Sequence, residues 1–406
     1  MDEEIHRTVE RQKEYFTRGK TLNLGRRRAA LQTLKAALIE REPDFLQALK
    51  TDLSKPPAEA YLSEVGLVVR EIDYVLRRLH NWVRPRRVRT PLFSQPASSR
   101  IYPEPYGVAL VISPWNYPVQ LSLSPLVAAL AAGNCVILKP SETAPASSRL
   151  LARTLNELFE PGLVKTVEGE AETARALLEE DFDYIFYTGG KRVGRLVMEA
   201  ASRNLTPVTL ELGGKNPCLV DKNIAVKTAA RRIAWGKFFN AGQTCVAPDY
   251  LLVHADIRDA FLAAIGEAIV DFYGPDPKKS PDYARIVNRK HYLRLTRMLE
   301  GVNPEIGGQR DQEERYLAPT VVGLESPDHP LMEEEIFGPI LPVLTYRESD
   351  QALRVTKRYS RPLAFYLFTR NRRIRERIIR DTSSGGICVN DTISQIINPE
   401  LPFGGV

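Results

Sequence analysis

The sequence lacks several features that would restrict what the protein can be. Its four cysteines, Cys135, Cys218, Cys245 and Cys388, have no short spacing, so neither a disulfide framework nor a zinc motif is expected. The five histidines are equally dispersed, and no metal site is expected. No apolar run reaches the roughly 18 residues of a membrane span. The start is acidic and polar, unlike a secretory signal, so we expect a cytoplasmic protein.

The composition is that of an ordinary globular chain. The 406 residues are 43% hydrophobic and 26% charged, enough for large cores in two or three domains. The net charge of +6 comes in part from four arginines between Val83 and Arg89. A basic patch can bind nucleic acid, but this segment has no interleaved aromatic residues and no nucleic-acid motif. We therefore interpret it as a solvated linker or strand edge and expect no nucleic-acid partner.

The hydrophobic pattern predicts two α/β domains after a helical start. Residues 1–82 show helical spacing, with helices expected over Arg26–Leu49 and Ser63–Trp82. From Gly107 onward, short apolar runs alternate with amphipathic segments, which favours a parallel sheet covered by helices on both faces. The alternation begins again after Gly214. Strands are expected at Val108–Ser113, Asn134–Lys139, Val164–Val167, Tyr184–Tyr187, Val208–Glu211, Pro217–Val220, Tyr250–His254 and Leu363–Phe368. Helices are expected at Val119–Ala132, Ala146–Phe159, Ile224–Phe239 and Ile257–Phe272.

Two residues stand out chemically. Cys245 lies in a run of small and amide residues, Asn240–Pro248, and Glu211 lies 34 positions upstream. A thiol can act as a covalent nucleophile, and a carboxylate can act as the base that resolves the intermediate. Each signal is weak alone, because most cysteines in a chain of this length are inert core residues.

Unusual residues follow four of the expected strands. Asn116 and Tyr117 follow the first, and Lys139 ends the second, close to Glu142. The glycines Gly189, Gly190 and Gly194 connect a third strand to a helix, and Glu211 ends the last strand of the first domain. Ligands of open parallel sheets bind beyond the carboxyl ends of the strands. The glycine loop precedes a helix whose N-terminus favours phosphate, although helix entry alone also explains it.

Six motifs in this order resemble the aldehyde dehydrogenase superfamily, over nearly the whole chain. The run Ala234–Asp249 resembles its class 3 group, whose members act on fatty and aromatic aldehydes. The motifs are Pro114–Pro118, Leu138–Glu142, Leu210–Lys215, Gly242–Cys245, Glu334–Pro339 and Pro402–Val406.

The resemblance implies catalytic roles for three residues. Cys245 matches the nucleophile that forms a thiohemiacetal with the aldehyde and then a thioester. Asn116 matches the side-chain amide that stabilises the oxyanion together with the backbone N–H of Cys245. Glu211 matches the base that activates water to hydrolyse the thioester.

The resemblance also implies an NAD or NADP cofactor. Lys139 and Glu142 match residues that hold the adenosine ribose, and Glu335 and Phe337 match those that position the nicotinamide ribose and ring. Gly189, Gly190 and Gly194 match the phosphate-side loop of a variant Rossmann domain. Tyr117 and Trp235 match aromatic positions near the substrate tunnel, although plain core packing also explains them.

The expected architecture follows from the same resemblance. Residues 1–82 and 106–212 would form the coenzyme-binding domain and 213–390 the catalytic domain, while 83–105 and 391–406 would form a bridging β arm of a homodimer. The family continues beyond the position of Val406, so we expect a truncated C-terminus. A hydrophobic tail of the kind that anchors some class 3 members to membranes would lie in that missing part.

The expected activity is NAD(P)-dependent oxidation of aromatic or medium- to long-chain aldehydes to carboxylic acids. An enzyme that passes the thioester to coenzyme A is one alternative, and Glu211 argues for water as the acceptor instead. A non-catalytic binding protein on the same scaffold is the other alternative.

Overall fold

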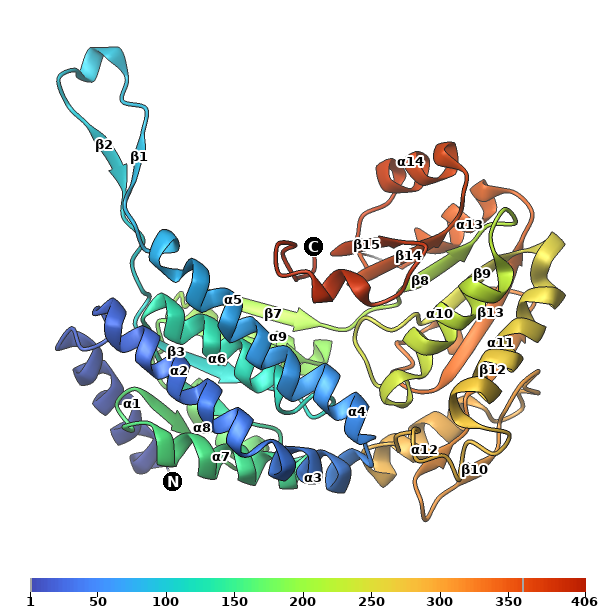
Figure 1. Cartoon of the computed structure of the whole chain (residues 1–406), viewed down its shortest axis with the longest axis horizontal. Coiled ribbons are helices and arrows are strands. Elements are labelled where there is room, and N and C mark those ends of the chain that lie inside the picture. The colour runs from blue at the N-terminus through green and yellow to red at the C-terminus, as the bar shows by residue number, and fades with distance from the viewer. Residues whose placement is uncertain (1, 360) are drawn as a thin grey trace. The chain divides into compact units, whose positions relative to one another are not determined.

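A computed structural model describes residues 2–359 and 361–406, and the chain divides into two compact units. Unit 1 comprises Met1–Leu49 and Ala60–Leu210, and unit 2 comprises Lys50–Glu59 and Glu211–Val406. Each unit contains a parallel β-sheet flanked by helices, which confirms the predicted α/β class (Figure 1).

Unit 1 is built on a five-stranded sheet in the order β5-β4-β3-β6-β7. The pairs β3–β4, β3–β6 and β4–β5 are parallel. Every residue of β3 and β4 is buried, as expected for strands covered on both faces. The strands are β3 Val108–Ile112, β4 Cys135–Lys139, β5 Val164–Thr166, β6 Tyr184–Gly189 and β7 Val208–Leu212.

The helices of the first 210 residues include one division that the sequence pattern did not predict. The expected helix over Arg26–Leu49 is two helices, α2 and α3, because Pro43 lacks the N–H that would continue the ladder of α2. A π-helical turn, Tyr61–Val65, precedes α5, so this helix begins after Ser63. The helices are α1 Asp2–Thr17, α2 Leu24–Glu40, α3 Glu42–Leu53, α4 Pro57–Ala60, α5 Gly66–Trp82, α6 Gln120–Ala132, α7 Pro145–Leu158, α8 Ala171–Leu178 and α9 Lys191–Arg203.

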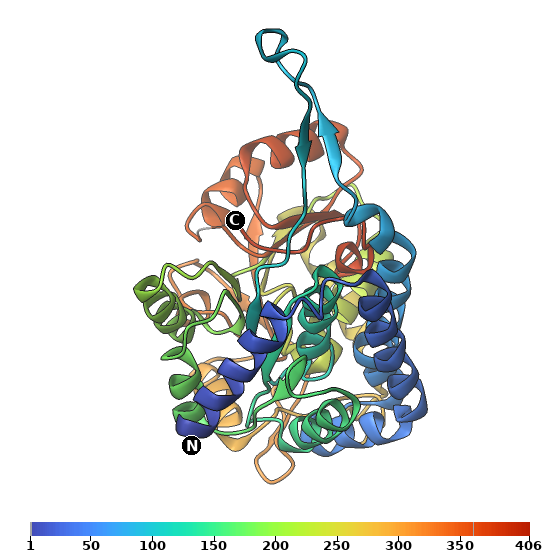
Figure 2. The ribbon, with the colours of Figure 1, turned by 90° about the vertical axis from the view of Figure 1, so that its left-hand side faces the viewer.

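An antiparallel hairpin connects α5 to β3. Its strands, β1 (Arg86–Val88) and β2 (Ser99–Ile101), are joined through a 3₁₀ turn at Leu92–Ser94. The hairpin extends away from α5 in both ribbon views (Figures 1 and 2). At its tip, Leu92 is 87% exposed and Phe93 is 90% exposed.

Unit 2 contains a six-stranded sheet in the order β12-β13-β9-β8-β14-β15, with every neighbouring pair parallel. Three of its strands, β12, β13 and β15, were not predicted, because glycine or Pro342 interrupts their apolar runs. The strands are β8 Pro217–Val220, β9 Tyr250–His254, β12 Thr320–Leu324, β13 Ile340–Tyr346, β14 Ala364–Phe368 and β15 Gly386–Val389. A separate two-stranded ribbon pairs β10 Arg310–Asp311 with β11 Tyr316–Leu317.

Helices cover both faces of this sheet. One core cluster includes side chains of α10, α11 and α12, such as Phe238, Phe261 and Leu295. A second cluster packs α13 and α14 on the sheet through Leu353 and Ile378. The helices are α10 Val226–Phe238, α11 Arg258–Tyr273, α12 Arg289–Met298, α13 Ser349–Thr356 and α14 Arg372–Asp381.

Candidate active site

Cys245 lies in a tightly constrained loop between α10 and β9. Asn240 and Ala241 have φ values of 52° and 50°, in the left-handed region that few non-glycine residues adopt. Gly242 has φ +73°, and a Cβ there would lie 2.3 Å from the carbonyl oxygen of Gly338. The side-chain amide of Gln243 donates to the carbonyl of Asn240, and its oxygen accepts from the N–H of Val287. The loop therefore has one conformation available, which fixes the thiol.

The Cys245 thiol is protonated at neutral pH in this environment. Burial, together with the neighbouring carboxylates of Glu335 and Glu211, raises its pKa to about 12. The backbone N–H groups of Cys245 and Val246 oppose this effect and lower the pKa. Because the thiolate is the reactive form, the site requires a base that removes the thiol proton.

Glu211 has the properties of such a base. It is the penultimate residue of β7, and its Oε2 is buried without a hydrogen-bond partner. Burial raises the pKa of this carboxyl, because no donor to Oε2 compensates for the lost solvation of its charge. The segment Pro402–Val406 approaches it, since a Cβ at Gly404 would lie 3.4 Å from its Oε1.

A second carboxylate, Glu335, lies against the backbone that follows β7. The N–H of Gly214 donates to Glu335 Oε1 at 3.2 Å. A Cβ at Gly213 would lie 2.0 Å from Glu335 Oε2, so only glycine permits this approach. Phe337, two residues further on, has φ 49°. Cys245, Glu211 and Glu335 thus form one electrostatically coupled group within unit 2.

A buried ion pair that the sequence did not predict holds the Glu335 segment. Lys215 Nζ lies 2.5 Å from Asp249 Oδ2 and also donates to the carbonyls of Leu331 and Glu334, at 2.6 and 2.8 Å. Asp249 Oδ1 accepts from the N–H of Ile336 at 2.9 Å. Asp249 lies four residues after Cys245, so the pair connects the nucleophile loop to the Glu335 loop.

Lys237 adds a buried amine near these carboxylates. Burial lowers the pKa of Lys237 to about 8; Asp249 raises it, Lys215 lowers it and Glu335 raises it. The side chain is 1% exposed, on the last turn of α10. The charged form of this amine is therefore less strongly favoured at neutral pH than that of a solvated lysine.

In unit 1, Asn116 and Tyr117 are both buried in the loop between β3 and α6. The carboxylate of Glu64, itself fully buried, accepts from the N–H groups of Val119 and Gln120 at 2.9 and 3.0 Å. An acidic group at a helix N-terminus satisfies unpaired backbone donors and complements the helix dipole. Glu64 thus fixes the beginning of α6 and, with it, the loop that carries Asn116.

Lys139 and Glu142 form an ion pair at the carboxyl end of β4. Their Nζ and Oε2 atoms lie 2.6 Å apart, with Lys139 buried and Glu142 exposed. Burial opposes ionisation of Glu142, but the hydrogen bond from Lys139, a backbone bond and the lysine charge together hold its pKa below the usual range. The Glu142 carboxylate is therefore held in its ionised form beside the lysine.

The three glycines lie where β6 meets α9. Gly189 ends the strand, Gly190 is the N-cap residue of the helix, and Gly194 is buried in the first turn of α9. A Cβ at Gly190 would meet nothing within 4 Å, so the backbone is open to a ligand there. The 13-residue helix that follows presents its N-terminal N–H groups, which favour a phosphate.

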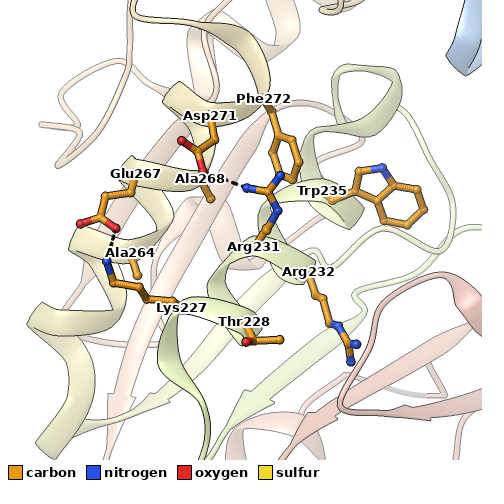
Figure 3. Close-up of a pocket in the computed structure, with 10 residues that line it drawn as sticks. All are labelled: Lys227, Thr228, Arg231, Arg232, Trp235, Ala264, Glu267, Ala268, Asp271 and Phe272. Atoms are coloured by element: carbon orange, nitrogen blue, oxygen red, sulfur yellow. Dashed lines mark hydrogen bonds and ion pairs between the residues drawn. The ribbon is translucent and has the colours of Figure 1, made fainter.

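Trp235 lines a pocket formed by side chains of α10 and α11 (Figure 3). Its ring packs against Phe239, with the centroids 5.2 Å apart. In the same pocket Lys227 pairs with Glu267 and Arg231 with Asp271, so the charges largely cancel. The indole lies apart from both ion pairs, and an apolar partner suits it better than an ionic one.

Two kinds of feature are absent from residues 2–359 and 361–406. No group of three or more His, Cys, Asp or Glu side chains there could hold a metal ion. None of the helices in this part of the chain is long and apolar enough to cross a membrane.

Comparison with known proteins identifies the family. The sequence matches the aldehyde dehydrogenase family over residues 1–406. The chain belongs to this family. It is 45% identical over 396 residues to 4,4'-diaponeurosporen-aldehyde dehydrogenase of Staphylococcus aureus (strain NCTC 8325 / PS 47), covering 97% of this chain and 86% of that protein. It is also 45% identical to aldehyde dehydrogenase family 3 member B1 of Mus musculus, covering 97% and 84%.

Solved structures agree with this assignment. The substrate-bound state of Staphylococcus aureus AldH superposes with a TM-score of 0.97 at 44% identity, covering 99% of this chain and 88% of that one. An indole-3-acetaldehyde dehydrogenase in complex with NAD⁺ superposes with a TM-score of 0.91 at 26% identity, covering 100% and 84%. This aldehyde dehydrogenase therefore oxidises aldehydes to carboxylic acids, and NAD(P) dependence is the norm of its family.

Within each unit, the structure brings predicted residues together. In unit 2, Cys245, Glu211 and Glu335 interact electrostatically, and Phe337 lies on the Glu335 loop. In unit 1, Lys139 and Glu142 contact each other, while Asn116, Tyr117 and the glycines follow neighbouring strands. Asp249, Lys237 and Glu64 were missed, because a buried charge far from its partner in sequence gives no local pattern. Lys215 was visible only as the last residue of a motif.

Proposed function

We propose that Cys245 is the nucleophile of this aldehyde dehydrogenase. Glu211 or Glu335 accepts the thiol proton, and the sulfur adds to the aldehyde carbon to give a thiohemiacetal. The Asn116 side-chain amide and the Cys245 N–H donate to the developing oxyanion. A donor of this kind contributes about 2.7–4 kcal/mol to transition-state stabilisation. The observation that carries the proposal is the coupling of the thiol to two carboxylates in one constrained loop region.

Glu211 then acts as the base for hydrolysis. After loss of hydride, a thioester remains on Cys245, and water must attack its carbonyl carbon. Glu211 Oε2 accepts no hydrogen bond from the protein, so this oxygen can accept a proton from that water. Its raised pKa makes it a stronger proton acceptor than a solvated carboxylate.

NAD or NADP is the hydride acceptor in this proposal. The residues fit a dinucleotide: the open backbone at Gly190 and the α9 N-terminus suit its phosphates, and the charged pair of Lys139 and Glu142 suits a ribose. Glu335 and Phe337 would position the nicotinamide half. The Glu142 carboxylate would repel a 2′-phosphate, so Glu142→Gln should raise kcat/KM with NADP relative to NAD. An unchanged ratio would mean that Glu142 does not contact the ribose.

We propose aromatic and medium- to long-chain aldehydes as the substrates. Trp235 lines a pocket beside Phe272, and a relative's name specifies 4,4'-diaponeurosporen-aldehyde. We also propose a homodimer that uses the hairpin of residues 83–105. A panel of aldehydes of graded chain length, each with NAD and NADP, would define both specificities.

The decisive test uses Glu211→Gln. The variant should release one equivalent of reduced coenzyme and then stop, with an acyl adduct on Cys245 in the mass spectrum of the quenched protein. If Glu211 also removes the thiol proton, the burst itself should be slow and should accelerate as the pH rises. Unchanged steady turnover would remove Glu211 from catalysis and favour an enzyme that transfers the acyl group to coenzyme A.

A further inference from the structure

Three consecutive carbonyl groups at the nucleophile are held by two buried side chains of unit 2. Asn216 Nδ2 donates to the carbonyls of Cys245 and Ala247, at 2.7 and 3.0 Å. The Tyr366 hydroxyl donates to the carbonyl between them, that of Val246, at 2.5 Å. One of these side chains directly precedes β8 and the other lies on β14, and together they hold one short stretch of backbone.

Both side chains are themselves fixed in orientation. Asn216 is 1% exposed, and its Oδ1 accepts from the N–H of Ala364 at 3.0 Å, which determines which end of the amide faces Cys245. The Tyr366 hydroxyl accepts from Gln395 Nε2 at 3.1 Å. Its only proton is therefore directed at Val246.

The planarity of the peptide bond transmits this constraint to the sulfur. In a trans peptide, the C=O of one residue and the N–H of the next point in opposite directions. Asn216 holds the Cys245 carbonyl, and so the Val246 N–H must point away from Asn216. The backbone N–H groups of Val246 and Cys245 both lower the pKa of the Cys245 thiol. A hydrogen bond to the charged form favours the thiolate.

We propose that Asn216, assisted by Tyr366, is a positioning residue that directs the Val246 N–H at the Cys245 sulfur and thereby stabilises the thiolate. The proposal rests on the role of Cys245 as the nucleophile. Glu211 and Glu335 face the same sulfur and disfavour its negative charge, so donated backbone hydrogen bonds are needed to oppose them. Neither Asn216 nor Tyr366 contacts substrate in this proposal.

The test measures thiol reactivity directly. Alkylation of Cys245 by iodoacetamide is followed across a pH series, with mass spectrometry to identify the modified cysteine. Loss of one hydrogen bond to a charged group should reduce the thiolate fraction at a given pH about tenfold in Asn216→Ala, with the midpoint at higher pH. Tyr366→Phe should shift the midpoint in the same direction by a smaller amount. Coenzyme affinity should not change in either variant.

Tyr346→Phe is the matched control. Tyr346 is another buried tyrosine of unit 2, and its hydroxyl donates to the carbonyl of Val220 at 3.1 Å, on a strand away from Cys245. It should leave the alkylation profile unchanged. A folded Asn216→Ala variant with the wild-type profile would overturn the proposal. If Asn216→Ala does not fold, equal profiles for Tyr366→Phe and Tyr346→Phe would overturn it instead.

These outcomes are independent of the proposed reaction. If Cys245 were not the nucleophile, Cys245→Ala would retain turnover, and the alkylation profiles would still report how Asn216 affects the thiol. A shifted profile with normal coenzyme affinity supports positioning, because a general loss of structure would change both.

Discussion

Cys245 differs from the other three cysteines in what surrounds its sulfur. Cys135 and Cys218 are fully buried in strands, and Cys388 is buried in β15, whereas Cys245 keeps partial exposure beside two carboxylates. Cys245→Ala should therefore abolish turnover and leave coenzyme binding intact, as measured by steady-state kinetics and by titration with NAD. Single replacement of each other cysteine by Ala should retain activity. Full turnover in Cys245→Ala would show that the thiol has no catalytic role.

Glu211 carries a cost in stability that its catalytic role explains. Burial raises its pKa in the folded chain, so the folded state binds more protons than the unfolded state between the two pKa values. Its contribution to stability therefore falls as the pH rises through that interval. Glu211→Gln should raise Tm at neutral pH, and the difference should shrink as the pH falls toward about 4.3, the pKa of a free carboxyl.

Glu142 supplies a control of opposite sign. Lys139 contributes to a folded pKa of Glu142 below the usual range, so this carboxylate stabilises the fold above the unfolded pKa and loses that effect as the pH falls. Glu142→Gln should therefore lower Tm at neutral pH. For Glu211→Gln, a Tm at or below that of the wild type at neutral pH would contradict the interpretation that the buried Glu211 carboxylate destabilises the fold.

Among the structural elements, the loop before Cys245 depends most on glycine. Gly242 and Gly274 have similar left-handed φ values, +73° and +77°, but a Cβ at Gly274 would meet nothing within 4 Å. Gly274→Ala should cost only the backbone strain, about 1–3 kcal/mol, because φ 77° with ψ 178° is a region that essentially only glycine adopts. Gly242→Ala should cost more and should also reduce activity, because the loop must move away from Gly338. Denaturant unfolding and kcat/KM measure the two effects, and equal losses of stability would contradict the predicted clash.

The sequence predicted elements where the signal was local. The strands β3, β4, β8 and β9 coincide with short apolar runs, and the parallel α/β class follows from their alternation with helices. The division of α2 from α3 was missed although Pro43 is visible in the sequence, because the apolar spacing continues across it. The strands β12, β13 and β15 were missed because glycine and proline interrupt them.

The candidate site shows the same distinction. Cys245, Glu211 and Asn116 were recognisable because each lies in a short motif. The hydrogen bonds from Asn216 and Tyr366 to the backbone at Cys245 were not recognisable, because the donors lie 29 and 120 residues from the carbonyls that they hold. Hydrogen bonds of this separation depend on the strand order β8-β14-β15, which no local pattern specifies.

In the whole molecule, the predicted ligand-binding residues of unit 1 follow the carboxyl ends of adjacent parallel strands. Asn116 follows β3, Lys139 ends β4 and Gly189 ends β6, three neighbours in one sheet. Carboxyl ends of neighbouring parallel strands meet at one edge, where open sheets bind ligands. The hairpin of residues 83–105 lies outside this sheet. Its proposed role is in dimer formation.

The hairpin exposes apolar side chains that a monomer would leave in water. Leu92 and Phe93 are the most exposed large apolar residues of the hairpin, and burying such side chains at an interface is favourable by about 25 cal/mol per Å². The double substitution Leu92→Ser and Phe93→Ser should therefore convert a homodimer to a monomer, as measured by sedimentation velocity. Leu22→Ser is the matched control, because Leu22 is 58% exposed outside the hairpin. It should leave the dimer unchanged. A dimer that survives the double substitution would place the interface on another surface of the protein.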